Sequence, residues 1–159
     1  MKNLILALGL AGICFAAPLA FADVSSSDGL GTWEGTGIAQ DVSGSQQTPF
    51  TITMVRRSLG GGVVRADGTI HMKDGSDVAF WDEHAERPDG ACKVSSSLGN
   101  GGGRCFSNHM CQLYTERADG HAFATTYAID SRDHIRVLVT ELQAGKAIRF
   151  FSQDLVKKP

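Results

Sequence analysis

Apolar and polar residues alternate along much of this chain with a period of two, the pattern of an extended strand whose two faces meet different surroundings. Residues 49–57 show it most clearly, because Phe50, Ile52 and Met54 fall on one face while threonines occupy the positions between them. A proline at the first position suits the start of a strand. The pattern therefore predicts a strand here, with its apolar face directed into a core.

Short turn sequences separate the other alternating runs. Asp-Gly pairs favour the tight turns of β-hairpins, and they occur at Asp67-Gly68, Asp74-Gly75, Asp89-Gly90 and Asp119-Gly120. In the last third of the chain, the turn residues 131–133 and 144–145 lie between long apolar runs. This spacing predicts a series of antiparallel hairpins.

We predict an all-β fold, a single antiparallel meander of about eight to ten strands that closes into a small β-barrel. Neighbours in sequence usually pair in space, and closure removes the exposed edges of the sheet. The barrel domain is expected to cover residues 30–159, after a polar, flexible leader at 23–29. A single helical turn at 81–86 is the one departure from strand structure that we consider.

Residues 1–22 have the composition of a cleaved secretion signal. Lys2 precedes an apolar run at 4–19, and Ala20-Phe21-Ala22 predicts cleavage before Asp23. The apolar run is shorter than the ~20 residues that a membrane-spanning helix requires, although an uncleaved anchor is the alternative. We expect a periplasmic or secreted protein with no membrane span after the signal is removed.

The charge of the chain narrows the choice of partners. A formal net charge of −2 and an isoelectric point near 6.2 provide no extended basic surface for a polyphosphate backbone. Nucleic acid is therefore not an expected partner.

Three cysteines follow the predicted cleavage site, which allows at most one internal disulfide and leaves one further thiol. If 91–96 and 103–108 pair as a hairpin across the glycine-rich stretch 97–102, Cys92 and Cys105 face each other within bonding range. A disulfide between Cys105 and Cys111 is the alternative. Either bond fits an oxidising compartment.

The first predicted strand carries Gly31-Thr32-Trp33, which resembles the Gly-x-Trp element in the opening strand of lipocalins and other calycin-type barrels. The resemblance implies that a basic residue from a late strand packs over this tryptophan, a role that Arg149 would fill through a cation–π contact. It also implies an interior open to a small apolar ligand. The candidate ligand-binding residues are Trp33, Phe50, Met54, Phe123, Tyr127 and Arg149, with Ile52 and Phe150 also in the lining. The alternative is that these side chains only fill a close-packed core.

No motif assigns a reaction, a metal or a cofactor. Donor residues occur at His71-Met72, at Cys105 and at 109–111, but their spacing does not match that of zinc sites. His84 lies among Asp82, Glu83 and Glu86, residue types that perform acid–base chemistry when they line a cleft. We expect neither a catalytic residue nor a metal ligand from these patterns.

Three functional hypotheses remain open. The preferred one is an exported, non-enzymatic barrel that binds a small apolar ligand. The second is a protein-interaction or inhibitor module that uses the loops expected at 82–90 and 96–104, because loops on a rigid sheet commonly carry recognition. The third is a barrel enzyme with a histidine and carboxylate acid–base site.

Overall fold

The computed structural model describes residues 29–87, 89–107 and 110–159. The predicted signal at 1–22 and the leader up to residue 28 lie outside the described residues, so their cleavage and flexibility stay predictions. The described residues form ten β-strands and no helix: β1 Gly31–Asp41, β2 Gln47–Gly60, β3 Val63–Met72, β4 Asp77–Glu86, β5 Ala91–Ser96, β6 Gly99–Ser107, β7 Met110–Glu116, β8 His121–Ser131, β9 His134–Gln143 and β10 Lys146–Lys157.

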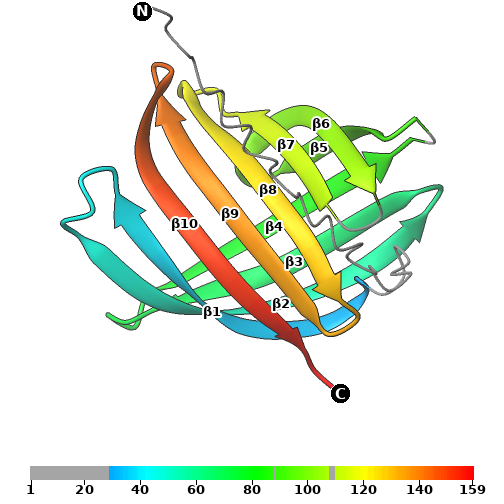
Figure 1. Ribbon diagram of the computed structural model, residues 1–159, viewed down its shortest axis with the longest axis horizontal. Helices are drawn as coiled ribbons and strands as arrows, with labels where there is room; N and C mark the ends of the chain where they lie inside the picture. The colour runs from blue at the N-terminus through cyan, green and yellow to red at the C-terminus, as the bar shows by residue number, and fades with distance from the viewer. Residues whose placement is uncertain (1–28, 88, 108–109) are drawn as a thin grey trace, which may run out of the picture.

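Each strand pairs with the next one along the chain, and β1 pairs with β10, so the sheet is a closed antiparallel barrel (Figure 1). The prediction of an all-β meander that closes on itself is confirmed. The strand number lies at the upper limit of the predicted range.

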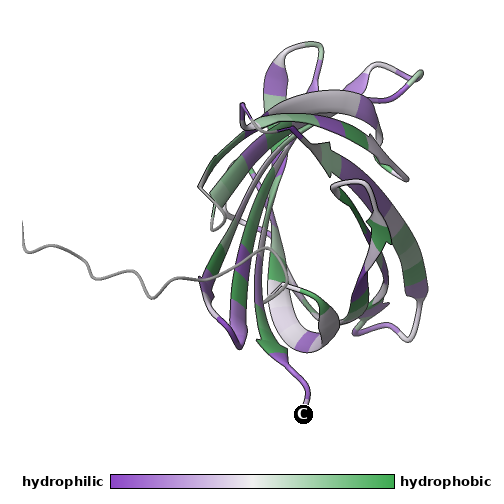
Figure 2. Ribbon diagram, turned by 90° about the vertical axis from the view of Figure 1, so that its right-hand side faces the viewer, coloured by the Kyte–Doolittle hydropathy of each residue, from purple (hydrophilic) through white to green (hydrophobic). Residues whose placement is uncertain are grey.

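The register of the pairings separates an inward from an outward row on every strand. Trp33 lies opposite Met54 on β2 and opposite Lys157 on β10. On β2, the predicted inward residues Phe50, Ile52 and Met54 are all buried, which confirms that strand and its face. Hydrophobic and hydrophilic residues alternate along the strands, as Figure 2 shows.

One end of the barrel is closed by apolar side chains. Trp33, Ile135 and Leu155 are at most 1% exposed, and Ile129 packs with them. Burial of each such side chain contributes about 1.5–3 kcal/mol. We call this the sealed end. It carries the turns at 61–62, 87–90 and 132–133 and both ends of the described chain. The opposite, exposed end carries the turns at 42–46, 73–76, 97–98, 117–120 and 144–145.

Glycines on the inward rows let aromatic rings approach the sheet. A Cβ atom at Gly68 would lie 2.3 Å from Cζ of Phe80, and one at Gly37 would lie 2.2 Å from Cζ of Phe50. Gly68 lies within β3, so the prediction of a turn at Asp67-Gly68 is wrong. A glycine inside a strand often marks a site where another group approaches the backbone closely.

Two segments that we expected to be irregular are also strands. Residues 81–86 extend β4 rather than forming a helical turn, and the glycine-rich segment 99–103 belongs to β6. The loops expected at 82–90 and 96–104 therefore shrink to short turns at 87–90 and 97–98. These two segments therefore offer fewer loop residues than the interaction-module hypothesis assumed.

The predicted disulfide between Cys92 and Cys105 is wrong, and the alternative is correct: Cys105 is bonded to Cys111. The turn of the β5–β6 hairpin has two residues rather than six, which places Cys92 opposite Gly103. Cys105 instead lies directly opposite Cys111 on β7. Cys92 is buried, with its Sγ 3.9 Å from the carbonyl oxygen of Lys93.

We expect replacement of both Cys105 and Cys111 by alanine to lower the free energy of unfolding by about 2 kcal/mol, because the bond restricts the unfolded chain. Urea denaturation of the oxidised protein measures the change. The matched control is Cys92→Ala, in which peptide mapping should still recover the bonded Cys105 and Cys111 peptides. A Cys92→Ala protein without that bond would contradict the assignment.

Candidate functional site

Four polar side chains meet inside the barrel, although they come from three separate strands. Arg56 lies on the inward row of β2, Asp82 and His84 on that of β4, and Tyr127 on that of β8. Arg56 Nη2 is 3.4 Å from Tyr127 Oη, Tyr127 Oη is 3.3 Å from His84 Nε2, and His84 Nδ1 is 3.3 Å from Asp82 Oδ2. We call these residues the interior polar chain.

The chemistry of the side chains fixes the donor in one hydrogen bond of the interior polar chain. A guanidinium only donates hydrogen bonds, so Arg56 donates to the phenol oxygen of Tyr127. The hydroxyl of Tyr127 also contacts Nε2 of His84, and Nδ1 of His84 contacts the Asp82 carboxylate. All three distances exceed the usual 2.9–3.0 Å for such bonds, so these hydrogen bonds are weak.

Within the interior polar chain, Arg56 is the residue whose side chain lacks a hydrogen-bond partner for one of its donors in the described part of the protein. Arg56 is 7% exposed, and its Nη1 atom has no hydrogen-bond partner among the described residues. The guanidinium lies over the Tyr127 ring, 5.2 Å from the ring centroid, and beside Gly29, where a Cβ atom would lie 2.6 Å from Nη1. Burial of a charged group is costly unless it is paired and hydrogen-bonded.

The inward rows of β3 and β4 form an apolar wall near the exposed end. Its members are Ile70, Met72, Val78 and Phe80, which follow one another across the β3–β4 ladder and its neighbouring positions. Ile70, Met72 and Phe80 are half-buried, and Val78 is 51% exposed although it lies on the inward row. The opposite side of the same end is closed, because Phe123 and Glu141 are at most 9% exposed. Ile70, Met72 and Phe80 also pack against the core, so solvent reaches the apolar wall mainly at Val78.

A second polar cluster borders the exposed end. His121 Nδ1 lies 3.0 Å from Glu141 Oε1, and Arg149 Nη1 lies 3.7 Å from Glu141 Oε2. Gln143 Nε2 is 3.3 Å from His121 Nε2. These contacts satisfy the buried carboxylate of Glu141 with partners from the two neighbouring strands, β8 and β10, so the cluster is structurally complete as it stands.

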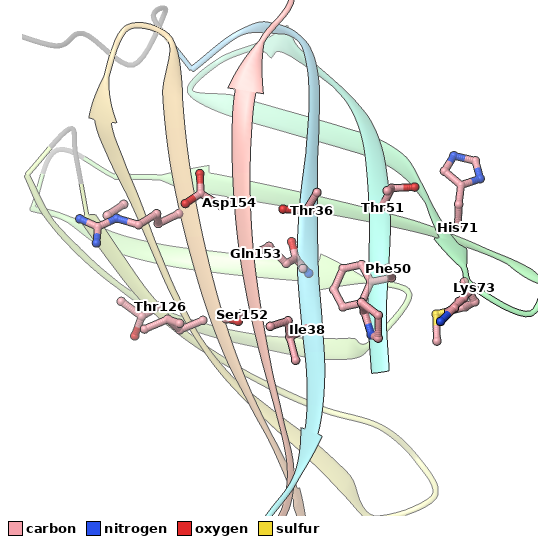
Figure 3. A pocket seen from close by; sticks show the side chains of 16 residues that line it. Thr36, Ile38, Phe50, Thr51, His71, Lys73, Thr126, Ser152, Gln153 and Asp154 are labelled. Carbon is pink, nitrogen blue, oxygen red and sulfur yellow. The ribbon is translucent and has the colours of Figure 1, made fainter. Parts of the chain in front are cut away.

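The outer surface carries an open groove of about 970 Å³. Figure 3 shows side chains around it from β1, β2 and β10, among them Thr36, Ile38 and Ser152. Ile38 is 41% exposed, and Leu138 at the other side of the groove is 58% exposed. The groove lacks the convergent, buried polar groups that distinguish a binding site from a surface hollow, whereas the interior has them.

Charges at the edge of this groove are mutually satisfied. Arg136 and His134 both contact Asp130, and His134 also contacts Asp154. The hydrogen bond from Arg136 holds the pKa of the Asp130 carboxyl below its ordinary value. This network therefore stabilises the outer face and presents no unsatisfied group to a ligand.

The predicted ligand-binding residues fall into different places. Trp33, Phe50, Met54 and Phe123 are buried on inward rows, as is Ile52, and Tyr127 belongs to the interior polar chain. Phe150 was expected in the lining, but it lies on the outward row opposite Gln40 and is 42% exposed.

The basic residue over the tryptophan is Lys157, not Arg149. The Lys157 Nζ atom lies 5.7 Å from the centroid of the Trp33 ring. Arg149 lies opposite Asp41, at the other end of β1, and packs against Phe151. The register of the last strand decides this, since Lys157 is the residue directly opposite Trp33.

Acidic residues near His84 were candidates for acid–base chemistry, and the strand separates them. Asp82 faces inward with His84, but Glu83 faces outward and pairs with Arg65 at 2.7 Å. Among residues 29–159, leaving aside the undescribed positions, no group of three or more His, Cys, Asp or Glu side chains is placed to hold a metal ion. His109, one of the donors considered above, lies outside the described residues.

Sequence reasoning missed Arg56 because it treats charged residues as outward-facing. The signal was present: Arg56 continues the two-residue spacing of Phe50, Ile52 and Met54. Within the described part of the chain, no helix has the length and apolar character needed to cross a bilayer.

Comparisons with known proteins identify the fold. No family model and no curated protein matches the sequence. The S-type phycobiliprotein lyase CPES from Guillardia theta has a similar structure, with a TM-score of 0.68 at 10% identity over 84% of this chain and 90% of that one. Rv2717c from M. tuberculosis gives a TM-score of 0.64 at 16% identity, over 84% and 94% of the two chains.

A third similar structure, EF1p2_mFAP2b bound to DFHBI, has a TM-score of 0.50 at 8% identity and covers 84% of this chain and 97% of that chain. At these identities the likeness shows the fold alone. The chain shares the closed antiparallel β-barrel fold of these structures, and the significance of Gly31-Thr32-Trp33 stays a prediction.

We expect Tyr127→Phe to lower the free energy of unfolding by about 1–3 kcal/mol, because it removes the phenol that links two buried polar groups. Tyr114→Phe is the matched control: Tyr114 is 47% exposed, and its substitution should stay within about 0.5 kcal/mol of wild type. Chemical denaturation of the three proteins measures both changes. Equal effects of the two substitutions would show that the interior polar chain contributes nothing.

Proposed function

We propose that this chain is an exported, non-enzymatic protein that binds a small and largely apolar ligand inside its barrel. The observation that carries the proposal is the apolar wall. Val78 is 51% exposed and Ile70, Met72 and Phe80 are only half-buried, although all four face the interior of a closed barrel. The ligand enters from the exposed end, where this wall begins.

The physical reason is the cost of wetting apolar surface inside the barrel. Each square ångström of apolar surface that leaves water contributes about 25 cal/mol. A ligand seated on the apolar wall removes that surface from water without rearranging the packed layer around Trp33 and Leu155, which is already dry. The ligand is therefore small, because the sealed end limits the depth available to it.

The structural comparisons support the proposal at the level of the fold. A lipocalin-like barrel is the architecture of the structure that binds DFHBI, and of the protein named as a phycobiliprotein lyase. Barrels of this size have room for side chains and one small molecule. The identity of the ligand does not transfer from either protein.

Export rests on the predicted signal at 1–22 and fits the disulfide between Cys105 and Cys111, since disulfides persist in oxidising compartments. We expect Asp23 to be the N-terminal residue of protein recovered from the periplasm or the culture medium. Intact-mass measurement of that material tests the expectation. Exported protein that retains residues 1–22 would refute the cleavage.

We expect Val78→Asp to weaken binding of N-phenyl-1-naphthylamine, a neutral apolar fluorophore, by at least about tenfold, because a carboxylate on the wall would have to lose its water. Fluorescence titration of the purified protein measures the affinity. The matched control is Val156→Asp, since Val156 is 55% exposed but faces outward from β10. Wild-type protein that does not bind the fluorophore would reject the proposed function.

A third variant separates the interior from the outer groove. Leu138 lines the groove and faces outward, so Leu138→Asp should leave the affinity for the fluorophore unchanged. If Leu138→Asp abolishes binding while Val78→Asp does not, the ligand sits in the groove and the interior site is wrong.

A further inference from the structure

We propose that the ligand of this barrel carries an anionic oxygen-containing group, and that Arg56 binds that group together with Tyr127. This inference rests on the proposed function and adds the chemistry of the ligand's polar end. The observation behind it is the buried guanidinium of Arg56, whose Nη1 atom has no hydrogen-bond partner among the described residues.

Arg56 differs from most of the other arginines in being buried without a carboxylate partner among the described residues. Five arginines with more exposed side chains each contact a carboxylate: Arg57, Arg65, Arg117, Arg136 and Arg149. In the described part of the chain, the buried Arg56 forms no such pair, and its contacts are the phenol and ring of Tyr127. A buried charge needs a counter-ion far more than an exposed one does.

The surroundings of Arg56 fit an oxyanion. A guanidinium carries donors in a planar fork that matches a carboxylate or a phosphate. One branch of the fork, Nη2, is held by Tyr127, which leaves Nη1 to donate to the ligand. Asp82 does not fill this role, since its carboxylate contacts His84 at the far end of the interior polar chain.

Gly29 keeps the space beside this branch small. A Cβ atom there would lie 2.6 Å from Nη1 and 2.8 Å from Cδ1 of Ile129. Any residue other than glycine at position 29 would place its Cβ atom too close to the guanidinium. The guanidinium is thus held in one place beneath the chain at the sealed end.

A purely structural role for Arg56 makes the opposite prediction for stability. If the guanidinium only holds the interior together, its removal lowers the melting temperature. If it is kept for a ligand, the ligand-free protein carries an uncompensated buried charge, and Arg56→Met raises the melting temperature, by about 2–4 °C. Differential scanning calorimetry of the ligand-free protein distinguishes the two roles without any binding measurement.

The binding test compares two ligands that differ only in the polar end, dodecanoate and 1-dodecanol, each displacing N-phenyl-1-naphthylamine. In the wild-type protein, we expect dodecanoate to bind at least about tenfold more tightly than the alcohol, since only the carboxylate accepts a charge-assisted hydrogen bond between two ions. Arg56→Met should remove that difference while the affinity for 1-dodecanol changes by less than about threefold.

Arg57→Met is the matched control, because Arg57 is the next residue of β2 and its 55%-exposed side chain pairs with Asp67 on the outer face. It removes the same charge from the protein but should keep the preference for dodecanoate. Loss of the preference in both variants would assign it to the overall charge and overturn the inference.

The remaining outcomes separate this inference from the proposed function. If 1-dodecanol and the fluorophore bind but Arg56→Met leaves dodecanoate unaffected, the anion site is wrong and the apolar site stands. If neither binds to wild type, the proposed function is wrong. A fall in melting temperature on Arg56→Met would assign the guanidinium a purely structural role and overturn the inference.

Discussion

The pairing of β1 with β10 is the constraint on which the rest of the structure depends. It turns the meander into a closed surface, and it gives every strand one row of side chains that cannot reach bulk water except through the ends. Because side chains alternate between the faces of a strand, a shift of one residue in this pairing would exchange the two rows of β1 or β10. Trp33, opposite both Met54 and Lys157, marks the register that the protein adopts.

The barrel interior has an apolar part and a polar part. Around β1, β9 and β10 it is dry and close-packed, with Trp33, Ile135 and Leu155 almost completely buried. Towards β4 and β8 it holds the interior polar chain, whose hydrogen bonds run from one side of the barrel to the other. An apolar molecule with one polar end matches this division better than a wholly apolar one, because each part of it meets surroundings of its own kind.

The alternation of residue types predicted the closed all-β fold and the inward face of β2, since burial of Phe50, Ile52 and Met54 leaves little choice of register. The prediction failed at glycines, because glycine occurs both in turns and at close approaches within strands. Gly68 and the glycines of β6 resemble turn residues in sequence, but they occupy strands in which another backbone or ring approaches closely. The misread length of the β5–β6 turn then shifted the cysteine register and gave the wrong disulfide.

The candidate site was less accessible to sequence reasoning than the fold was. Tyr127 was among the predicted binding residues, and His84 and Asp82 were noted as neighbours, but Arg56 was not considered. Contacts between β2, β4 and β8 depend on how the barrel closes, and a pattern within one strand carries no information about them.

Both ends of the described chain lie at the same end of the barrel, which matters for attaching the protein to a surface. Gly31 begins β1 and Lys157 ends β10 at the sealed end of the barrel, close to Trp33. A tether, tag or fused reporter joined beyond Lys157 therefore emerges on the side away from the turns at 42–46 and 73–76. Immobilised by its carboxyl terminus, the barrel would present its exposed end to the surrounding solution, an orientation suited to a surface-bound sensor.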